Sequence, residues 1–158
     1  MKLGRLDAVI EGPRLVLGGR VDDGAAVLSD LAAQLPAGDV MIDTDAVTFV
    51  NSVGMREWMR CVRTLRARGT VTLTRVADVL MTQINLRPEL ASSVRVTSFH
   101  APYVCAACGA EATPLVDVAT HTADLGRLRA PKLPCPDCGQ VMDLGDFPER
   151  YLSIFRQA

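Results

Sequence analysis

Two short cysteine motifs in the C-terminal third carry the clearest chemistry of the sequence. They read Cys105-Ala-Ala-Cys108-Gly and Cys135-Pro-Asp-Cys138-Gly, and residues 109–134 separate them. Two thiolates three positions apart can bind one ion from a tight turn, and the glycine that follows suits a turn with positive φ. Two such turns supply four sulfurs, which form a tetrahedral site suited to zinc. The motifs therefore predict a structural Zn²⁺ ion held by Cys105, Cys108, Cys135 and Cys138.

This spacing is typical of a zinc ribbon, which we place at residues 101–146. Iron on the same four sulfurs, as in rubredoxin, is the alternative that the motif leaves open. A segment this short barely forms a core alone, whereas zinc binding contributes about 10–16 kcal/mol to such sites. We therefore expect a structural staple in preference to a contact with nucleic acid. In a reducing compartment such cysteines are ligands more often than disulfides.

A second candidate site lies in residues 47–69, "VTFVNSVGMREWMRCVRTLRARG", where an apolar strand-like run passes directly into a helical pattern. Asn51 and Ser52 stand at the junction, and both residue types are preferred as helix N-caps. The helix then shows one apolar stripe at helical spacing, formed by Met55, Trp58, Met59, Val62 and Leu65. Arg56, Arg60 and Arg63 fall on a different face. That basic face is either an ordinary solvated surface or the docking site of an acidic partner.

The elements around this junction follow from hydrophobic periodicity. We expect strands at 5–12, 14–22, 40–43, 70–76 and 92–99, and helices at 27–35, 52–68 and 77–86. Strands separated by helices indicate crossover connections and a mixed α/β sheet covered by helices. We therefore expect two domains, an α/β domain at residues 1–100 and a zinc ribbon with a short C-terminal helix at residues 101–158.

Composition and missing motifs argue against several functional classes, namely nucleic-acid binding, membrane insertion and catalysis. The formal net charge of −1 gives no general case for nucleic-acid binding, and from residue 101 onward seven acidic side chains stand against five basic ones. No apolar run approaches the ~20 residues that span a bilayer. The N-terminal stretch lacks the unbroken apolar core of a signal peptide, so we expect a cytoplasmic protein. Paired acids, a phosphate-cradling glycine loop and a nucleophile elbow are missing from the sequence, which therefore predicts no enzyme and no small-molecule substrate.

The single cysteine and the two histidines outside these motifs receive no catalytic or ligand role. Cys61 lies mid-helix beside the apolar stripe, where a cysteine is usually a small buried apolar residue. His100 and His121 lack ligand spacing. His100, which precedes Ala-Pro at the domain junction, is interpreted as a linker residue.

Residues 39–58, "DVMIDTDAVTFVNSVGMREW", resemble the STAS domain, the fold of the anti-sigma factor antagonists. That family shows a buried strand ending in Asp and then Asp-Ser-Ser-Gly opening a helix. Asp43 matches the strand-end Asp, and Asn51-Ser52-Val53-Gly54 stands where Asp-Ser-Ser-Gly would be. The resemblance covers residues 1–100, and the expected element order agrees with it. The sequence departs from the family motif at two positions, with Asn51 in place of Asp and Val53 in place of the second Ser.

The resemblance implies a bacterial regulatory module that docks another protein, such as an anti-sigma kinase, through residues 49–53 and the helix start at 52–63. It makes Ser52 the phosphorylation candidate, since the matching serine releases the family's antagonists from their kinase when modified. The expected partner-binding residues are Asn51, Ser52, Val53, Gly54, Arg56, Arg60 and Arg63. The alternative is a non-switching scaffold component of a larger complex, in which Asn51 and Ser52 only cap a helix. A nucleic-acid adaptor using the ribbon is the third hypothesis.

Overall fold

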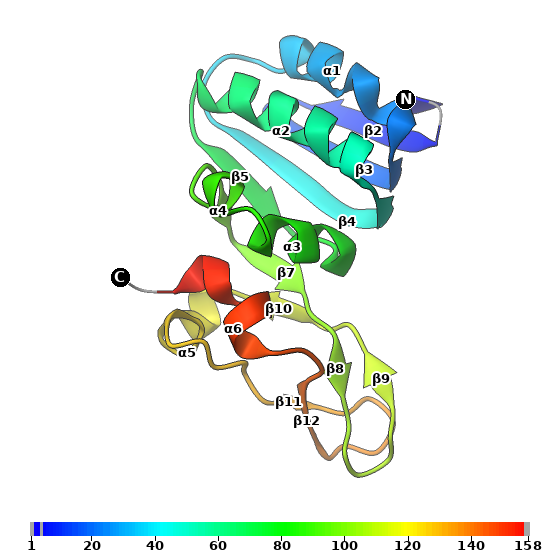
Figure 1. Cartoon of the computed structure of the whole chain (residues 1–158), viewed down its shortest axis with the longest axis vertical. Helices are drawn as coiled ribbons and strands as arrows, with labels where there is room; N and C mark the ends of the chain where they lie inside the picture. Colours follow the sequence, from blue (N-terminus) through cyan, green and yellow to red (C-terminus); the bar gives the residue numbers. More distant parts are fainter. Residues whose placement is uncertain (1, 4, 157–158) are drawn as a thin grey trace.

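The computed structural model describes residues 2–3 and 5–156, so the outermost ends of both predicted domains lie outside it. The described chain is a mixed α/β structure with one mixed six-stranded sheet and a smaller region of short strands (Figure 1). This agrees with the α/β class that periodicity predicts. None of the described helices combines the length and apolar character needed to cross a membrane.

The large sheet has its strands in sequence order. They are β1 (Lys2–Leu3), β2 (Leu6–Glu11), β3 (Arg14–Val21), β4 (Val40–Val50), β5 (Val71–Thr74) and β6 (Arg95–Val96). The first three pair antiparallel, and β3 to β6 pair parallel. Parallel neighbours require crossover connections, and the helices of this part provide them.

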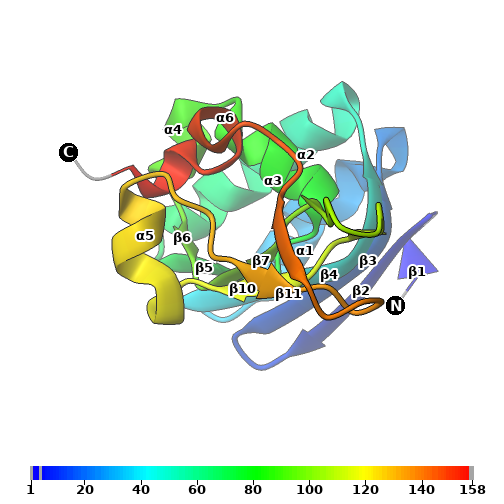
Figure 2. The ribbon, with the colours of Figure 1, turned by 90° about the horizontal axis from the view of Figure 1, so that it is seen from below.

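Those helices cover one face of the sheet, as Figure 1 and Figure 2 show. They are the 3₁₀ turn η1 (Asp23–Val27) and helices α1 (Leu28–Gln34), α2 (Ser52–Arg66), α3 (Asp78–Asn85) and α4 (Pro88–Ala91). Strand alternation places Leu15, Ile42 and Leu73 under the helices, where all three are fully buried. On α2, Trp58 of the apolar stripe is buried in this core as its spacing predicts, and Cys61 beside the stripe is buried as well.

Two strand predictions need correction. The strand predicted to end at Asp43 continues to Val50, with a register shift against β3 between Asp43 and Ala46. At this shift the Asp43 carboxylate accepts from Arg14 at 2.8 Å and from the backbone N–H of Asp45 at 3.0 Å. A buried charge with such partners does not interrupt a strand. The strand predicted at 92–99 is two short strands, β6 and β7 (Ser98–His100), since the chain leaves the large sheet after β6.

The C-terminal part contains a four-stranded sheet in the order β11-β12-β8-β9. Its strands are β8 (Tyr103–Val104), β9 (Glu111–Ala112), β11 (Leu133–Pro134) and β12 (Val141–Leu144). The remaining elements are β10 (Leu115–Asp117), η2 (Ala119–His121), α5 (Thr122–Gly126), α6 (Pro148–Tyr151) and η3 (Ser153–Phe155).

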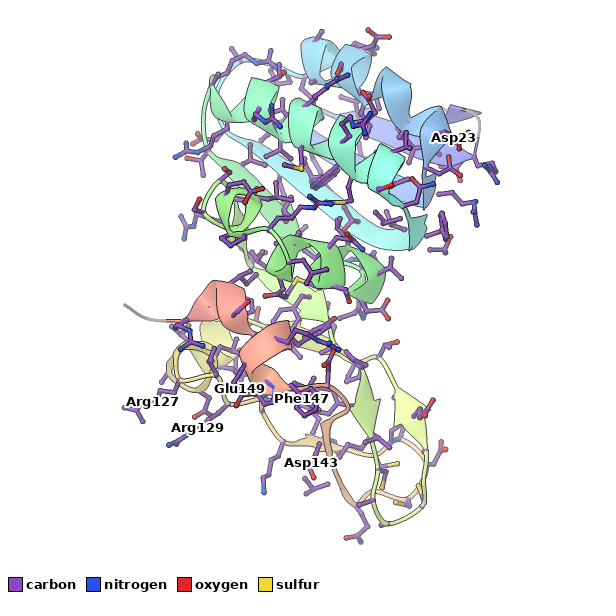
Figure 3. All side chains as sticks on the ribbon, viewed as in Figure 1. Asp23, Arg127, Arg129, Asp143, Phe147 and Glu149 are labelled. Atoms are coloured by element: carbon purple, nitrogen blue, oxygen red, sulfur yellow. The ribbon has the colours of Figure 1, made fainter. Side chains whose placement is uncertain are left out.

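Strand pairing and a shared apolar contact join the two parts of the chain. Strand β7, which ends the predicted first domain, pairs antiparallel with β10 of the C-terminal part. Phe99 of β7 stacks on Phe155 with ring centroids 5.1 Å apart, and Tyr151 lies 6.4 Å away. Phe147, by contrast, points outward and is 71% exposed (Figure 3).

Candidate functional site

The two cysteine motifs fold into two equivalent turns. In the first, the N–H of Gly109 donates to the carbonyl of Cys105 at 2.8 Å, and in the second Gly139 donates to Cys135 at 2.9 Å. Gly109 and Gly139 have φ values of 77° and 76°, which a side chain would strain. The glycine in each motif is therefore a requirement of the turn.

The turns bring the four cysteine Sγ atoms together, all within 4.8 Å of one another. The contacts between the two turns join Cys105 to Cys138 and Cys108 to Cys135, both at 3.6 Å between sulfurs. The thiols are free, with no disulfide in the described chain. Cys105 and Cys135 are buried, while Cys108 and Cys138 are exposed. Four convergent sulfurs on one compact centre fit a tetrahedral metal ion.

Backbone amides around the centre favour thiolates. The backbone N–H of Cys108 makes the largest contribution to lowering the pKa of Cys105, to about 7. The amide of Asp137 likewise points at Cys135 Sγ, at 3.4 Å. The N–H of Ala110 lowers the pKa of Cys108, but Cys138, desolvation and the other two cysteine side chains together raise it to about 12. Several thiolates can therefore share this space only with a cation among them.

The cysteine set thus has the donors, spacing and amide pattern for one ion of zinc or iron. Zn²⁺ bound there would crosslink β8, β9, β11 and β12, whose short strands offer little core of their own. This supports a structural role for the ion. The cysteine part of the predicted site is confirmed as a cluster able to hold a metal.

At the second site, Asn51 is the N-cap of α2. Its backbone is extended, at φ −123°, and its side-chain oxygen accepts from the N–H of Gly54 at 2.9 Å. Ser52 is the first helical residue, and its hydroxyl has no hydrogen-bond partner within the described chain. The expectation that Ser52 caps the helix is therefore wrong. The Asn51 side chain already accepts from the N–H of Gly54, so the helix start does not use the exposed Ser52 hydroxyl.

Gly54 holds the start of α2 directly against the sheet. A Cβ at Gly54 would lie 1.9 Å from the backbone oxygen of Val21, so only glycine allows this approach. The N–H of Asn51 donates to the same oxygen at 3.2 Å. The start of α2 is therefore held tightly against β3. Gly54 itself is buried, while its neighbours Ser52 and Val53 are exposed.

The outward face of α2 is basic. Arg56, Arg60 and Arg63 are exposed, as are Ser52 and, at 40%, Val53. Residues four apart lie on one helical face, so the Ser52 hydroxyl is next to Arg56, and Arg56 is next to Arg60. Arg60 also pairs with Glu57 at 3.2 Å. We call this surface, formed by Ser52, Val53, Arg56, Arg60 and Arg63, the α2 face.

Sequence reasoning missed a buried carboxylate beside this helix start. Asp22 is 1% exposed and pairs with Arg5 at 2.8 Å and Arg20 at 3.2 Å. Its pKa is lowered, chiefly by the N–H of Gly24, which its side chain caps. Arg20 lies only two residues before Asp22, on β3, but Arg5 comes from an earlier part of the chain, and no local sequence pattern predicts its contact with Asp22.

The residue interpreted as a linker, His100, has specific partners instead. Its ring nitrogens contact Asp45 and the carbonyl of Thr113, and Asp45 also pairs with Arg75 at 3.0 Å. Arg75 has a positive φ of 48°, which is unusual for a residue with a side chain. His121 lies on η2, and its charge helps to lower the pKa of Asp117 after the hydrogen bonds from Thr120.

Comparison with known proteins adds no family to these observations. The chain matches no protein-family model, no curated protein and no solved structure. Function therefore has to follow from the residues of the two sites.

Proposed function

We propose that the protein is a STAS-like regulatory module, similar to an anti-sigma factor antagonist, that binds another protein through the α2 face. One observation carries the proposal: the exposed Ser52 hydroxyl is unused by the fold and stands at the end of a row of exposed arginines. A surface residue without a structural task is free to serve recognition or modification. The rigid contact of Gly54 with β3 presents this surface in one fixed geometry.

Phosphorylation of Ser52 would switch such a surface without unfolding it. A phosphate adds about −1.5 to −2 charge, and the helix N-terminus tolerates a negative group. Ser52 is one helical turn from Arg56, so the phosphate would pair with a cation that a partner needs. Asn51 remains the cap in either state, because its contact with Gly54 does not involve Ser52.

The partner of this surface is a protein with an acidic docking patch, such as an anti-sigma kinase-like protein. We further propose that the protein is a bacterial regulator without enzymatic activity and that it is cytoplasmic. A structural Zn²⁺ ion would hold the C-terminal part together. The mixed charge of that part supports a structural role over nucleic-acid binding. Figure 3 shows Arg127 and Arg129 extending into solvent on the part that also carries Asp143 and Glu149.

A non-switching scaffold component is the second candidate. Asn51 and Val53 stand where the STAS motif has Asp and Ser, and Asn51 is fully used as a cap. In that case the α2 face would bind a partner permanently, and charge at Ser52 would leave the complex intact.

Affinity capture from a lysate of the source cells separates these functions. We expect a regulatory partner to bind the wild type and to be lost with Ser52→Asp, while circular dichroism shows both proteins folded. Ser29→Asp is the matched control, because it adds the same charge to an exposed serine in the first turn of another helix, α1, away from the α2 face. Equal capture of the partner by all three proteins would contradict the switch and support the scaffold component. Capture of nucleic acid alone would contradict both of these functions.

A further inference from the structure

The imidazole of His100 lies between the large sheet and the C-terminal part, and both of its nitrogens are engaged. Nε2 is 2.5 Å from Oδ1 of Asp45 on β4. Nδ1 is 2.9 Å from the backbone oxygen of Thr113, in the segment that joins β9 to β10. The side chain is 22% exposed, so it is largely shielded from solvent.

Both partners of this ring accept hydrogen bonds. A carbonyl oxygen has no proton to donate, and an ionised carboxylate has none either. A neutral imidazole carries one N–H, so it satisfies only one of the two contacts. Both are satisfied together when the ring carries two protons and a positive charge.

The charged groups around the ring come from several elements. Asp45 also accepts from Arg75 at 3.0 Å, which occupies its second oxygen, Oδ2, and leaves Oδ1 for the imidazole. Asp43, two residues earlier on β4, is paired with Arg14 at 2.8 Å and Arg75 at 3.3 Å. On the other side the Tyr151 hydroxyl donates to the backbone oxygen of His100 at 2.7 Å.

The position of these contacts makes them a joint between two parts of the molecule. Asp45 belongs to the six-stranded sheet, whereas Thr113 belongs to the segment between the first cysteine turn and β10. Next to them, the N–H of Ala101 donates to Pro114 at 3.2 Å. The ring thus ties residues 111–117 to β4 through side-chain contacts that depend on its protons.

We propose that His100 is a pH-sensitive latch, which holds residues 111–117 against Asp45 when the imidazole is protonated and loosens them when it is neutral. A ring with a single N–H keeps only one of the contacts with Asp45 and Thr113, because both partners are acceptors. Low pH therefore closes the joint between the sheet and the C-terminal part, and high pH opens it. This latch is independent of partner binding at the α2 face.

The test uses the whole protein with its metal, and measures hydrogen exchange of the β10 amides between about pH 5.5 and about pH 8.5, corrected for intrinsic exchange. Nitrogen NMR of the two histidine rings gives their protonation in the same samples. In the wild type we expect protection of Leu115 and Val116 to fall about tenfold or more as the His100 ring becomes neutral.

Asp45→Asn is the decisive variant. An asparagine amide donates to the bare Nε2 of a neutral ring, while its oxygen still accepts from Arg75, so protection should become independent of pH. His100→Gln should give low protection at every pH. His121→Gln, at the only other histidine, should behave as the wild type. Protection that is flat with pH in the wild type would overturn the latch, and so would an equal pH dependence in Asp45→Asn.

Discussion

At the scale of single residues, Asn51 and Ser52 are adjacent but have different tasks. Asn51 has an extended backbone and caps α2, whereas Ser52 is already helical and leaves its hydroxyl exposed. Both residue types are favoured as caps, so the sequence could place the helix start but could not choose between them. The choice depends on which residue has extended φ and ψ, and the close approach of Gly54 to Val21 settles that in the folded chain.

Because only Asn51 caps the helix, alanine substitutions at Asn51 and Ser52 should have unequal effects on the free energy of unfolding. Asn51→Ala should lower the free energy of unfolding by about 0.5–2 kcal/mol, because the N–H of Gly54 loses its acceptor. Ser52→Ala should change it by no more than about 0.5 kcal/mol, as expected for an exposed residue without contacts. Urea denaturation of the metal-bound protein measures both. Equal losses would show that the Ser52 hydroxyl also contributes to the cap.

At the scale of elements, the cysteine turns were the most predictable part of the molecule. The spacing within each motif and the glycine after it determine a local turn, so neighbouring residues contain the information. The length of β4 was not predictable in this way. Beyond Asp43 it continues through pairing with β3, and the Asp43 charge is balanced by Arg14 and Arg75, which lie 29 and 32 positions away in the chain. The role of His100 was missed for the same reason, since Asp45 is 55 positions away.

Metal removal should loosen these elements selectively. A chelator takes away the ion that would join the two turns, so hydrogen exchange should accelerate in residues 103–112 and 133–142. The six-stranded sheet should keep its protection, since its core does not depend on the cysteines. The α6 segment should stay docked too, because Asn85 of α3 donates to the carbonyl of Tyr151 at 2.7 Å. Exchange mass spectrometry before and after chelation measures this, and unchanged exchange near the cysteines would contradict a metal centre.

At the scale of the whole molecule, the two parts predicted as separate domains meet where β7 pairs with β10, and these strands lie side by side in Figure 2. The stacking of Phe99 on Phe155 and the hydrogen bond from Asn85 to Tyr151 also join the two parts. Periodicity predicted the helix-covered mixed sheet, because alternation and helical spacing are local patterns that burial enforces. It did not predict the contact of η3 with Asn85, whose oxygen accepts from Ser153 at 3.0 Å. Such contacts join distant segments and leave no period in the sequence.

The central claim is that a partner docks on the α2 face, and charge reversal of that face tests it most directly. We would compare the wild type with the triple variant Arg56→Glu, Arg60→Glu, Arg63→Glu by affinity capture from source-cell lysate, after circular dichroism has confirmed that both are folded. The three arginines are exposed, so the fold should survive their replacement. We expect the partner captured by the wild type to be absent from the variant. Capture of the same partner by both proteins would place the docking surface elsewhere on the molecule.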